Sequence, residues 1–168
     1  MSDIFNPNEA IETLIERYKA TVYGVALSYV NSREDADDIF QEVFLTLYKV
    51  KPEFNSEEHR KAWLIRTTKN FALRVVDSTY NRRVTPSDDI QSGSVTFKSK
   101  EENAIYLAIK SLSENYRDII YLFYFEDMSV DQIAKTLNLS TSNVKVRLMR
   151  GREQLKEILR REEEFSNL

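Results

Sequence analysis

The stretch SVDQIAKTLNLSTSNVKVRLMRGREQL, residues 129–155, decides the fold of this chain because a short turn divides it into two helical patterns. The first pattern has a capping-box start at Ser129 and Gln132. Its apolar side chains recur at the spacing of one helix face, at Val130, Ile133, Ala134 and Leu137. Asn138, which opens the turn, adopts the left-handed backbone conformation at low cost. We therefore predict a helix-turn-helix, with an ordinary helical hairpin as the alternative.

The second helix of this stretch, expected from Thr141 to about residue 160 and capped by Ser140 or Thr141, divides into two faces. The buried stripe consists of Val144, Leu148, Gly151, Leu155 and Ile158. The centre of the opposite face consists of Ser142, Val146, Met149 and Glu153. Cations flank this centre on both sides: Lys145, Arg152 and Lys156 on one, Arg147 and Arg150 on the other. The pattern fits a helix in a DNA major groove, with the cations at phosphates and the centre of the face at base edges. The alternative is a solvated amphipathic helix in which the arginines have no binding role.

The total charge does not indicate a nucleic-acid ligand, because the 168 residues contain 27 acidic and 24 basic side chains. Two basic segments nevertheless lie in this acidic chain, residues 60–83 with a net charge of +6 and residues 141–168 with +2. The absence of cysteine excludes disulfides and thiolate zinc sites, and the single histidine cannot build a histidine-rich metal site. No signal peptide or membrane-spanning run is recognised, so we expect a soluble, cytoplasmic protein without membrane insertion.

The chain is predicted to be all-α, because it contains only three Gly and three Pro and long runs have helical periodicity. Residues 84–98 contain Pro, Gly, Ser and Asp without an apolar period, which is typical of a flexible linker. We expect two small helical domains, residues 1–83 and 100–161, joined by a linker at 84–99 and followed by a frayed tail at 162–168.

A helix that starts near Glu34, after a cap at Ser32, separates an apolar side from an acidic one. The apolar side consists of Ala36, Phe40, Val43, Phe44 and Leu47, and the acidic side of Asp35, Asp38, Gln41 and Glu42. An acidic face would repel DNA phosphates and fits a basic protein partner. A merely solvated face and a carboxylate metal site, as in helical di-iron proteins, are the alternatives.

A third helix, around residues 60–78, has a mixed stripe formed by Trp63, Thr67, Asn70 and Arg74. Arg60 and Arg66 flank this stripe, and Leu64, Phe71, Ala72 and Val75 are predicted to point inward. An aromatic ring, an amide and several cations suit single-stranded DNA, which offers base faces, base edges and phosphates. Core packing is the alternative role for the Trp.

Three segments of the chain resemble the extracytoplasmic-function sigma factors, the small two-domain initiation factors of bacteria. Residues 112–155, LSENYRDIIYLFYFEDMSVDQIAKTLNLSTSNVKVRLMRGREQL, resemble region 4 of that family. YVNSREDADDIFQEVFLTLYK, residues 29–49, resembles region 2.2, and AWLIRTTKNFALRVVDS, residues 62–78, resembles regions 2.3 and 2.4. The family commonly has a basic residue where this chain reads LFYF, residues 122–125, so one contact to DNA is expected to be missing.

The resemblance implies an alternative sigma factor that binds core RNA polymerase, recognises the −35 element with its second domain and helps to melt the −10 element. It implies that Asp35, Asp38, Gln41 and Glu42 dock on the β′ clamp helices. It assigns −10 DNA to Arg60, Trp63, Arg66, Thr67, Asn70 and Arg74, together with a base-capturing loop at Phe54–Lys61. For −35 DNA the predicted contacts are Thr141, Ser142, Lys145, Val146, Arg147, Met149, Arg150 and Arg152.

The same resemblance implies a contact with the polymerase β flap, an anti-sigma partner, no cofactor and no enzymatic activity of the chain itself. Two other functions are compatible with single features of the sequence. A stand-alone helix-turn-helix regulator would use only the second domain. A metal-dependent hydrolase would use the carboxylates between Asp35 and Glu42.

Overall fold

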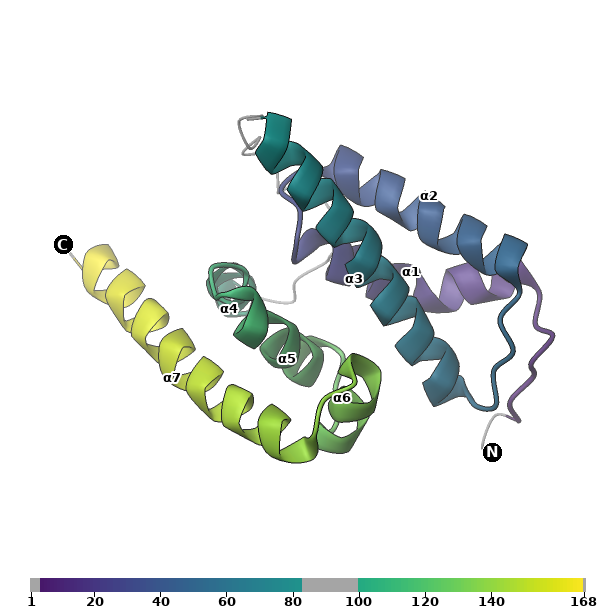
Figure 1. Cartoon of the computed structure of the whole chain (residues 1–168). Helices are drawn as coiled ribbons and strands as arrows, with labels where there is room; N and C mark the ends of the chain where they lie inside the picture. The colour runs from purple at the N-terminus through teal and green to yellow at the C-terminus, as the bar shows by residue number, and fades with distance from the viewer. Residues whose placement is uncertain (1–3, 83–99, 168) are drawn as a thin grey trace. The chain divides into compact units, whose positions relative to one another are not determined.

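Residues 4–82 and 100–167, which the computed structural model describes, form seven helices and no strand (Figure 1). The chain divides into two compact units, Met1–Val95 and Thr96–Leu168. The all-α prediction is therefore confirmed for the described part of the chain, while the predicted linker at 84–99 lies outside it. Within this part, no helix is both long and apolar enough to cross a membrane.

The first unit is built from three helices that all pack against one another: α1 (Ile11–Leu27), α2 (Arg33–Val50) and α3 (Glu57–Arg82). Helix α1 buries Leu14, Tyr18, Val22 and Val25, which recur at helical spacing and therefore share one face. Helix α2 begins after Ser32, whose side chain accepts a hydrogen bond from the Asp35 backbone N–H. Its predicted inner face is confirmed for Ala36, Val43, Phe44 and Leu47, which are buried.

Helix α3 closes this three-helix core with Leu64, Ile65 and Ala72, which are all buried. Thr68 is also fully buried, and its hydroxyl donates to the Leu64 carbonyl at 2.6 Å. The buried Thr68 hydroxyl thus has its hydrogen-bond partner within α3. The three-helix core does not use the opposite side of α3.

The second unit is built from α4 (Lys100–Lys110), α5 (Glu114–Phe125), α6 (Val130–Leu137) and α7 (Thr141–Ser166). Its core is formed by Tyr106, Ile109, Ile119, Ile120, Ile133, Val144, Leu148 and Leu155. Helix α7 packs against all three other helices of the unit. Close packing on α5 is possible because α7 has Gly151 at the contact, where a Cβ atom would lie only 2.8 Å from Ile120 Cγ1.

The predicted helix-turn-helix is present in α6, α7 and the turn between them. Ser129 and Gln132 form the expected capping box at the start of α6. Asn138 adopts the left-handed conformation with a φ of 57°. Ser140 caps α7 by accepting a hydrogen bond from the Asn143 backbone N–H at 3.1 Å.

Helix α7 continues to Ser166, through most of the segment for which the sequence predicts a frayed tail. Arg160 pairs with Glu157 at 2.6 Å and with Glu164 at 2.5 Å, and Arg161 pairs with Glu157 at 3.2 Å. Pairs three and four residues apart lie on one side of a helix and stabilise it. These pairs support the last turns of α7, and Glu164 of the acidic run takes part in one of them.

Candidate functional site

The outer face of α7 has the phase that the sequence predicts. Val144, Leu148, Gly151 and Leu155 are buried, whereas Ser142, Lys145 and Arg150 are exposed. Val146 and Met149 lie on the same outer face, with 40% and 54% of their surface exposed. Two apolar side chains are therefore accessible between cations on one helix face, and such side chains can contact thymine methyl groups.

Four of the five cations that flank this face are the predicted −35 contacts, and they are held in different ways. Lys145 and Arg150 extend into solvent. Arg147 donates from Nε to Asn143 Oδ1 at 2.9 Å, within its own helix. Arg152 instead reaches to α5, where its guanidinium lies over the rings of Phe123 and Tyr124 at 5.0 Å and 5.9 Å from the centroids.

The Tyr124 hydroxyl also accepts a hydrogen bond from Arg152 Nε at 3.2 Å. A positive charge is therefore present beside the LFYF segment of α5, although α5 itself has none there. From the sequence, one DNA contact is expected to be missing at the LFYF segment. The structure shows that Arg152 of α7 supplies a cation to the same surface.

The acidic side of α2 is exposed at Asp38, Gln41 and Glu42, while Asp35 is partly covered at the start of the helix. Leu45 and Tyr48 continue this side towards the end of α2 and are 44% and 60% exposed. Neither residue is among the predicted polymerase contacts, although their positions opposite the buried stripe could have identified them. We call the set Asp38, Gln41, Glu42, Leu45 and Tyr48 the α2 face.

Asp37 belongs to a different contact, because the Tyr23 hydroxyl donates to its Oδ1 at 2.6 Å. Burial and the neighbouring carboxylate raise the pKa of Tyr23 to about 12. The Tyr23 ring stacks on Phe40 with centroids 4.5 Å apart.

Across residues 4–82 and 100–167, no group of three or more His, Asp or Glu is placed to hold a metal ion.

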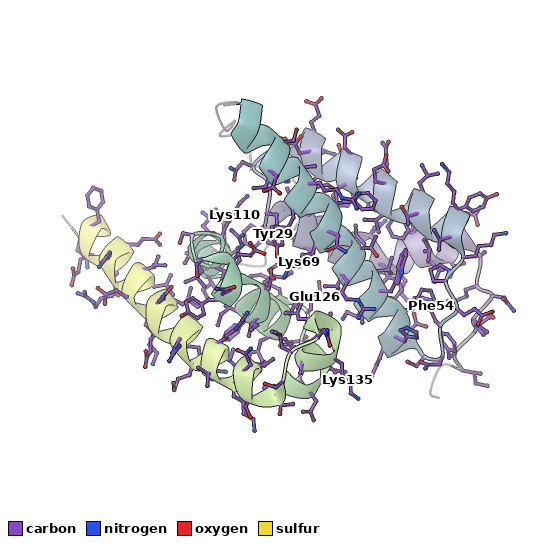
Figure 2. All side chains as sticks on the ribbon, in the orientation of Figure 1. Tyr29, Phe54, Lys69, Lys110, Glu126 and Lys135 are labelled. Atoms are coloured by element: carbon purple, nitrogen blue, oxygen red, sulfur yellow. The ribbon has the colours of Figure 1, made fainter. Side chains whose placement is uncertain are left out.

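The mixed stripe of α3 is accessible along its length. Asn70 and Arg74 are exposed, while Trp63, Arg66 and Thr67 are partly exposed. Phe54, from the loop before α3 (Figure 2), lies edge-on to Trp63 with ring centroids 5.9 Å apart. It also meets the His59 ring at 5.3 Å. The loop and the first turns of α3 thus form one aromatic group, Phe54, His59 and Trp63.

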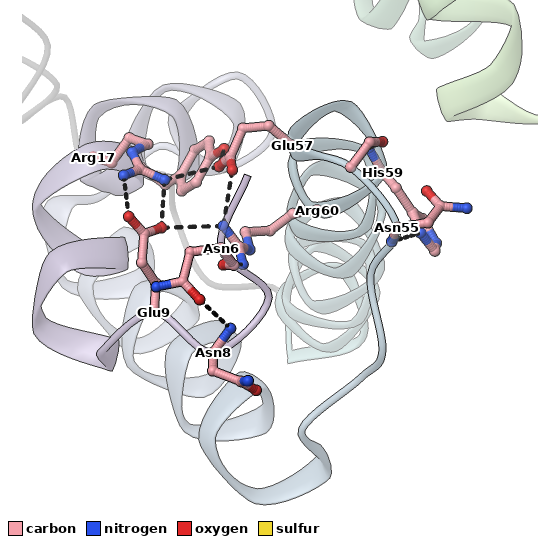
Figure 3. Close-up of polar contacts among 10 residues, drawn as sticks. Asn6, Asn8, Glu9, Arg17, Asn55, Glu57, His59 and Arg60 are labelled. Carbon is pink, nitrogen blue, oxygen red and sulfur yellow. Dashed lines mark hydrogen bonds and ion pairs between the residues drawn. The ribbon is translucent and has the colours of Figure 1, made fainter. Parts of the chain in front are cut away.

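Two expectations about this region need correction. The loop is shorter than Phe54–Lys61, because α3 begins at Glu57 and only residues 51–56 lie between α2 and α3. Arg60 does not flank the stripe, since only 1% of it is exposed. Its Nη1 donates to Glu57 at 2.8 Å and to Glu9 at 3.2 Å, and its Nη2 donates to the Asn6 carbonyl at 2.6 Å (Figure 3).

The Arg60 site is part of a larger polar network at the start of the first unit (Figure 3). Arg17 bridges Glu9 at 2.6 Å and Glu57 at 3.0 Å, and the Tyr18 hydroxyl donates to Glu57. The hydrogen bond from Arg17 holds the pKa of Glu9 below its ordinary value. Burial raises the pKa of Glu57, but hydrogen bonds from Tyr18 and Arg17 outweigh this effect and the pKa lies below normal.

Two family models match the chain, "Sigma-70 region 2" over residues 14–82 and "Sigma-70, region 4" over residues 102–155. The ECF RNA polymerase sigma factor SigM of Bacillus subtilis is 28% identical over 161 residues, which cover 90% of this chain and 96% of SigM. The chain belongs to the extracytoplasmic-function sigma factor family. The ECF sigma factor SigW of Bacillus subtilis is 25% identical over 170 residues, which cover 90% of each protein.

Solved structures agree with this sigma factor fold. The sigma factor RpoE of Bartonella quintana, in complex with the anti-sigma factor NepR, matches with a TM-score of 0.67. It shares 22% sequence identity, and the match covers 89% of this chain and 96% of that one. The α2 face, the stripe of α3 and the outer face of α7 all lie within the two matched regions, whereas Asn6 and Glu9 precede them.

Proposed function

We propose that this sigma factor binds core RNA polymerase and directs it to promoters by recognising the −35 element and by recognising and melting the −10 element. The observation that carries the proposal is the contrast between two exposed surfaces. The first unit presents acids on α2, and the second unit presents cations around two apolar side chains on α7. A chain that must meet both a protein and DNA needs surfaces of both kinds.

The α2 face is proposed to dock on the clamp helices of the polymerase β′ subunit. Asp38 and Glu42 supply charge for a basic partner, and Gln41 supplies a hydrogen-bonding amide between them. Leu45 and Tyr48 add exposed apolar area that would be buried on binding, which is the usual source of affinity at the centre of an interface. Asp35 lies at the edge of this contact.

The second surface, on α3, is proposed to hold the unpaired −10 strand. Trp63 offers a ring for stacking, Asn70 offers an amide for base edges, and Arg66 and Arg74 offer charge for phosphates. Thr67 lies between them on the same stripe. Arg60 is left out of this proposal because its guanidinium is buried and paired.

The outer face of α7 is proposed to enter the major groove of the −35 element. Ser142, Val146 and Met149 would meet base edges, while Lys145, Arg147, Arg150 and Arg152 would meet phosphates. Thr141 lies in the first turn, where free backbone N–H groups can also bind a phosphate. Solved relatives of this fold include complexes with anti-sigma factors, such as RpoE with NepR. We propose a protein of this class as a further partner.

Reconstitution with core polymerase tests the proposal. Transcription from a library of genomic fragments is expected to start at a defined set of sites only when the chain is added. Those sites should share sequences at −35 and −10. Specific duplex binding by the chain alone, with no effect on polymerase, would support a stand-alone regulator instead.

A pair of variants tests the α2 face within the same system. Asp38→Ala combined with Gln41→Ala should weaken the complex with core polymerase about tenfold or more, which is typical of central interface residues. Glu12→Ala combined with Glu16→Ala is the matched control, because these acids are exposed on α1 of the same unit. Equal affinity of both double variants would contradict the assignment of the α2 face.

A further inference from the structure

The residues that precede α1 are attached to the start of α3 by one buried side chain. The Asn6 carbonyl and the Glu9 carboxylate both accept hydrogen bonds from Arg60, at 2.6 Å and 3.2 Å. The ring of Phe5 also lies against the guanidinium, 4.7 Å from its carbon. The region 2 match begins at residue 14, so these contacts come from a part of the chain that the family regions leave unassigned.

The same guanidinium contacts the loop before α3. The Phe54 ring lies 5.7 Å from the Arg60 guanidinium carbon, while Phe5 provides the other aromatic contact. Phe54 in turn meets Trp63 edge-on at 5.9 Å. A continuous series of contacts therefore runs from residues 5–9, through Arg60 and Phe54, to the aromatic side chain proposed to stack on the −10 strand.

We propose that Glu9 and Arg60 are positioning residues for −10 recognition: by clamping the N-terminal segment against α3, they fix the loop at 51–56 and the Trp63 side chain in the arrangement that accepts an unpaired base. We call Phe5, Asn6, Glu9, Glu57 and Arg60 the N-terminal clamp. This inference rests on the proposed function, and it gives the clamp no direct contact with DNA.

The physical reason lies in the burial of the Arg60 charge. A buried guanidinium must keep its acceptors, because an uncompensated charge inside a protein is strongly unfavourable. Loss of the Glu9 charge would leave Glu57 and the Asn6 carbonyl as the acceptors of Arg60, and the guanidinium would shift towards them. This movement changes its contact with Phe54 and so the loop. Supporting residues of this kind often set how well a binding group is placed.

Glu9→Gln is the variant of choice, because it removes the charge and keeps the shape. Its matched control is Glu16→Gln, which removes an exposed ion pair to Lys19 with a distance of 3.0 Å. Both are compared with the wild type as holoenzyme on linear promoter DNA. The measurements are affinity for core polymerase, permanganate reactivity of −10 thymines, and base preference in randomised −10 and −35 libraries.

Glu9→Gln is expected to reduce opening of the duplex about tenfold, the effect of losing a hydrogen bond to a charged group. It should also relax the base preference at −10, while the −35 preference and core affinity stay unchanged. Glu16→Gln should match the wild type throughout. A purely structural role of the clamp would lower every activity in proportion to the folded fraction and would leave the base preference unaltered.

Phe5→Leu provides a milder second variant for the case in which Glu9→Gln is unfolded at the assay temperature. It removes only the aromatic contact and should reduce opening about threefold, with the same relaxed −10 preference. If the folded variants open DNA and select −10 bases as the wild type does, the positioning role is refuted while the sigma function stands. If the wild type itself supports no polymerase-dependent opening, the proposed function fails and this inference with it.

Discussion

Replacing Gly151 by Ala should destabilise the second unit, although Ala is the better helix former. Gly151 is buried in α7 against α5, and a Cβ there would lie 2.8 Å from Ile120 Cγ1 and 3.3 Å from Tyr116 Cβ. Ordinary contacts begin near 3.4 Å, so the neighbouring atoms must move. Ile120 is fully buried, and a β-branched side chain in a helix has one strongly preferred rotamer. The strain is therefore expected to fall on the packing of α5 against α7.

Two opposing effects set the size of the change in the free energy of unfolding. The exchange of Gly for Ala inside a helix stabilises by about 1 kcal/mol. Extra volume in a packed core costs about 1–3 kcal/mol. The expected net result is a loss of about 1 kcal/mol in the free energy of unfolding. In an Ile120→Ala background the contacts with Ile120 are absent and only the milder 3.3 Å contact with Tyr116 Cβ remains. Gly151→Ala should therefore be much less destabilising there or even stabilising, with a coupling between the two sites of about 2 kcal/mol.

Urea denaturation of the four proteins of this cycle measures the effect. Far-UV circular dichroism follows both units, and hydrogen exchange of peptides from α5 and α7 localises the change. Trp63 is the only tryptophan of the chain and lies in the first unit, so its fluorescence transition serves as an internal control. A Gly151→Ala protein more stable than the wild type, or a coupling near zero, would refute the close approach of the two helices.

Three further predictions concern single side chains of the second unit. The pKa of Lys110, which is labelled in Figure 2, is lowered from 10.5 in the unfolded chain to about 8 in the folded protein. Burial is the main cause, and the positive charge of Arg117 adds a smaller effect. The unfolded state thus binds more protons at this lysine between pH 8 and pH 10, so the stability of the wild type relative to Lys110→Met should rise by about 1 kcal/mol over that range in urea. A difference between the two proteins that does not change with pH would contradict the burial. Tyr124→Phe removes the hydroxyl that orients Arg152 and should weaken holoenzyme binding at −35 about threefold, by electrophoretic mobility shift, with no effect on core binding. Asn138→Val should lower the stability of the unit by about 1–2 kcal/mol, because its φ is 57°, whereas Asn138→Gly should leave the thermal midpoint nearly unchanged.

The local features of this protein could be predicted from the sequence because they depend on neighbours along the chain. The caps at Ser32, Ser129 and Ser140 each bond a backbone N–H three residues away. The turn at Asn138 and the buried stripe of α7 follow from residue type and helical spacing alone. The sequence therefore determined the all-α class, the helix-turn-helix and the side of α7 that is exposed.

The roles of individual charges, in contrast, depended on residues far away in the sequence. Arg60 and Arg74 look alike in a helical projection, yet Arg74 is exposed while Arg60 is buried against Glu9, 51 residues earlier. Arg152 likewise finds its partner in Tyr124, 28 residues earlier. Helical periodicity indicates on which side of a helix a cation lies, but only packing between helices decides whether water, an acid or an aromatic ring meets it. The tertiary structure therefore decided which cations remain available for DNA and which one connects the N-terminal segment to α3.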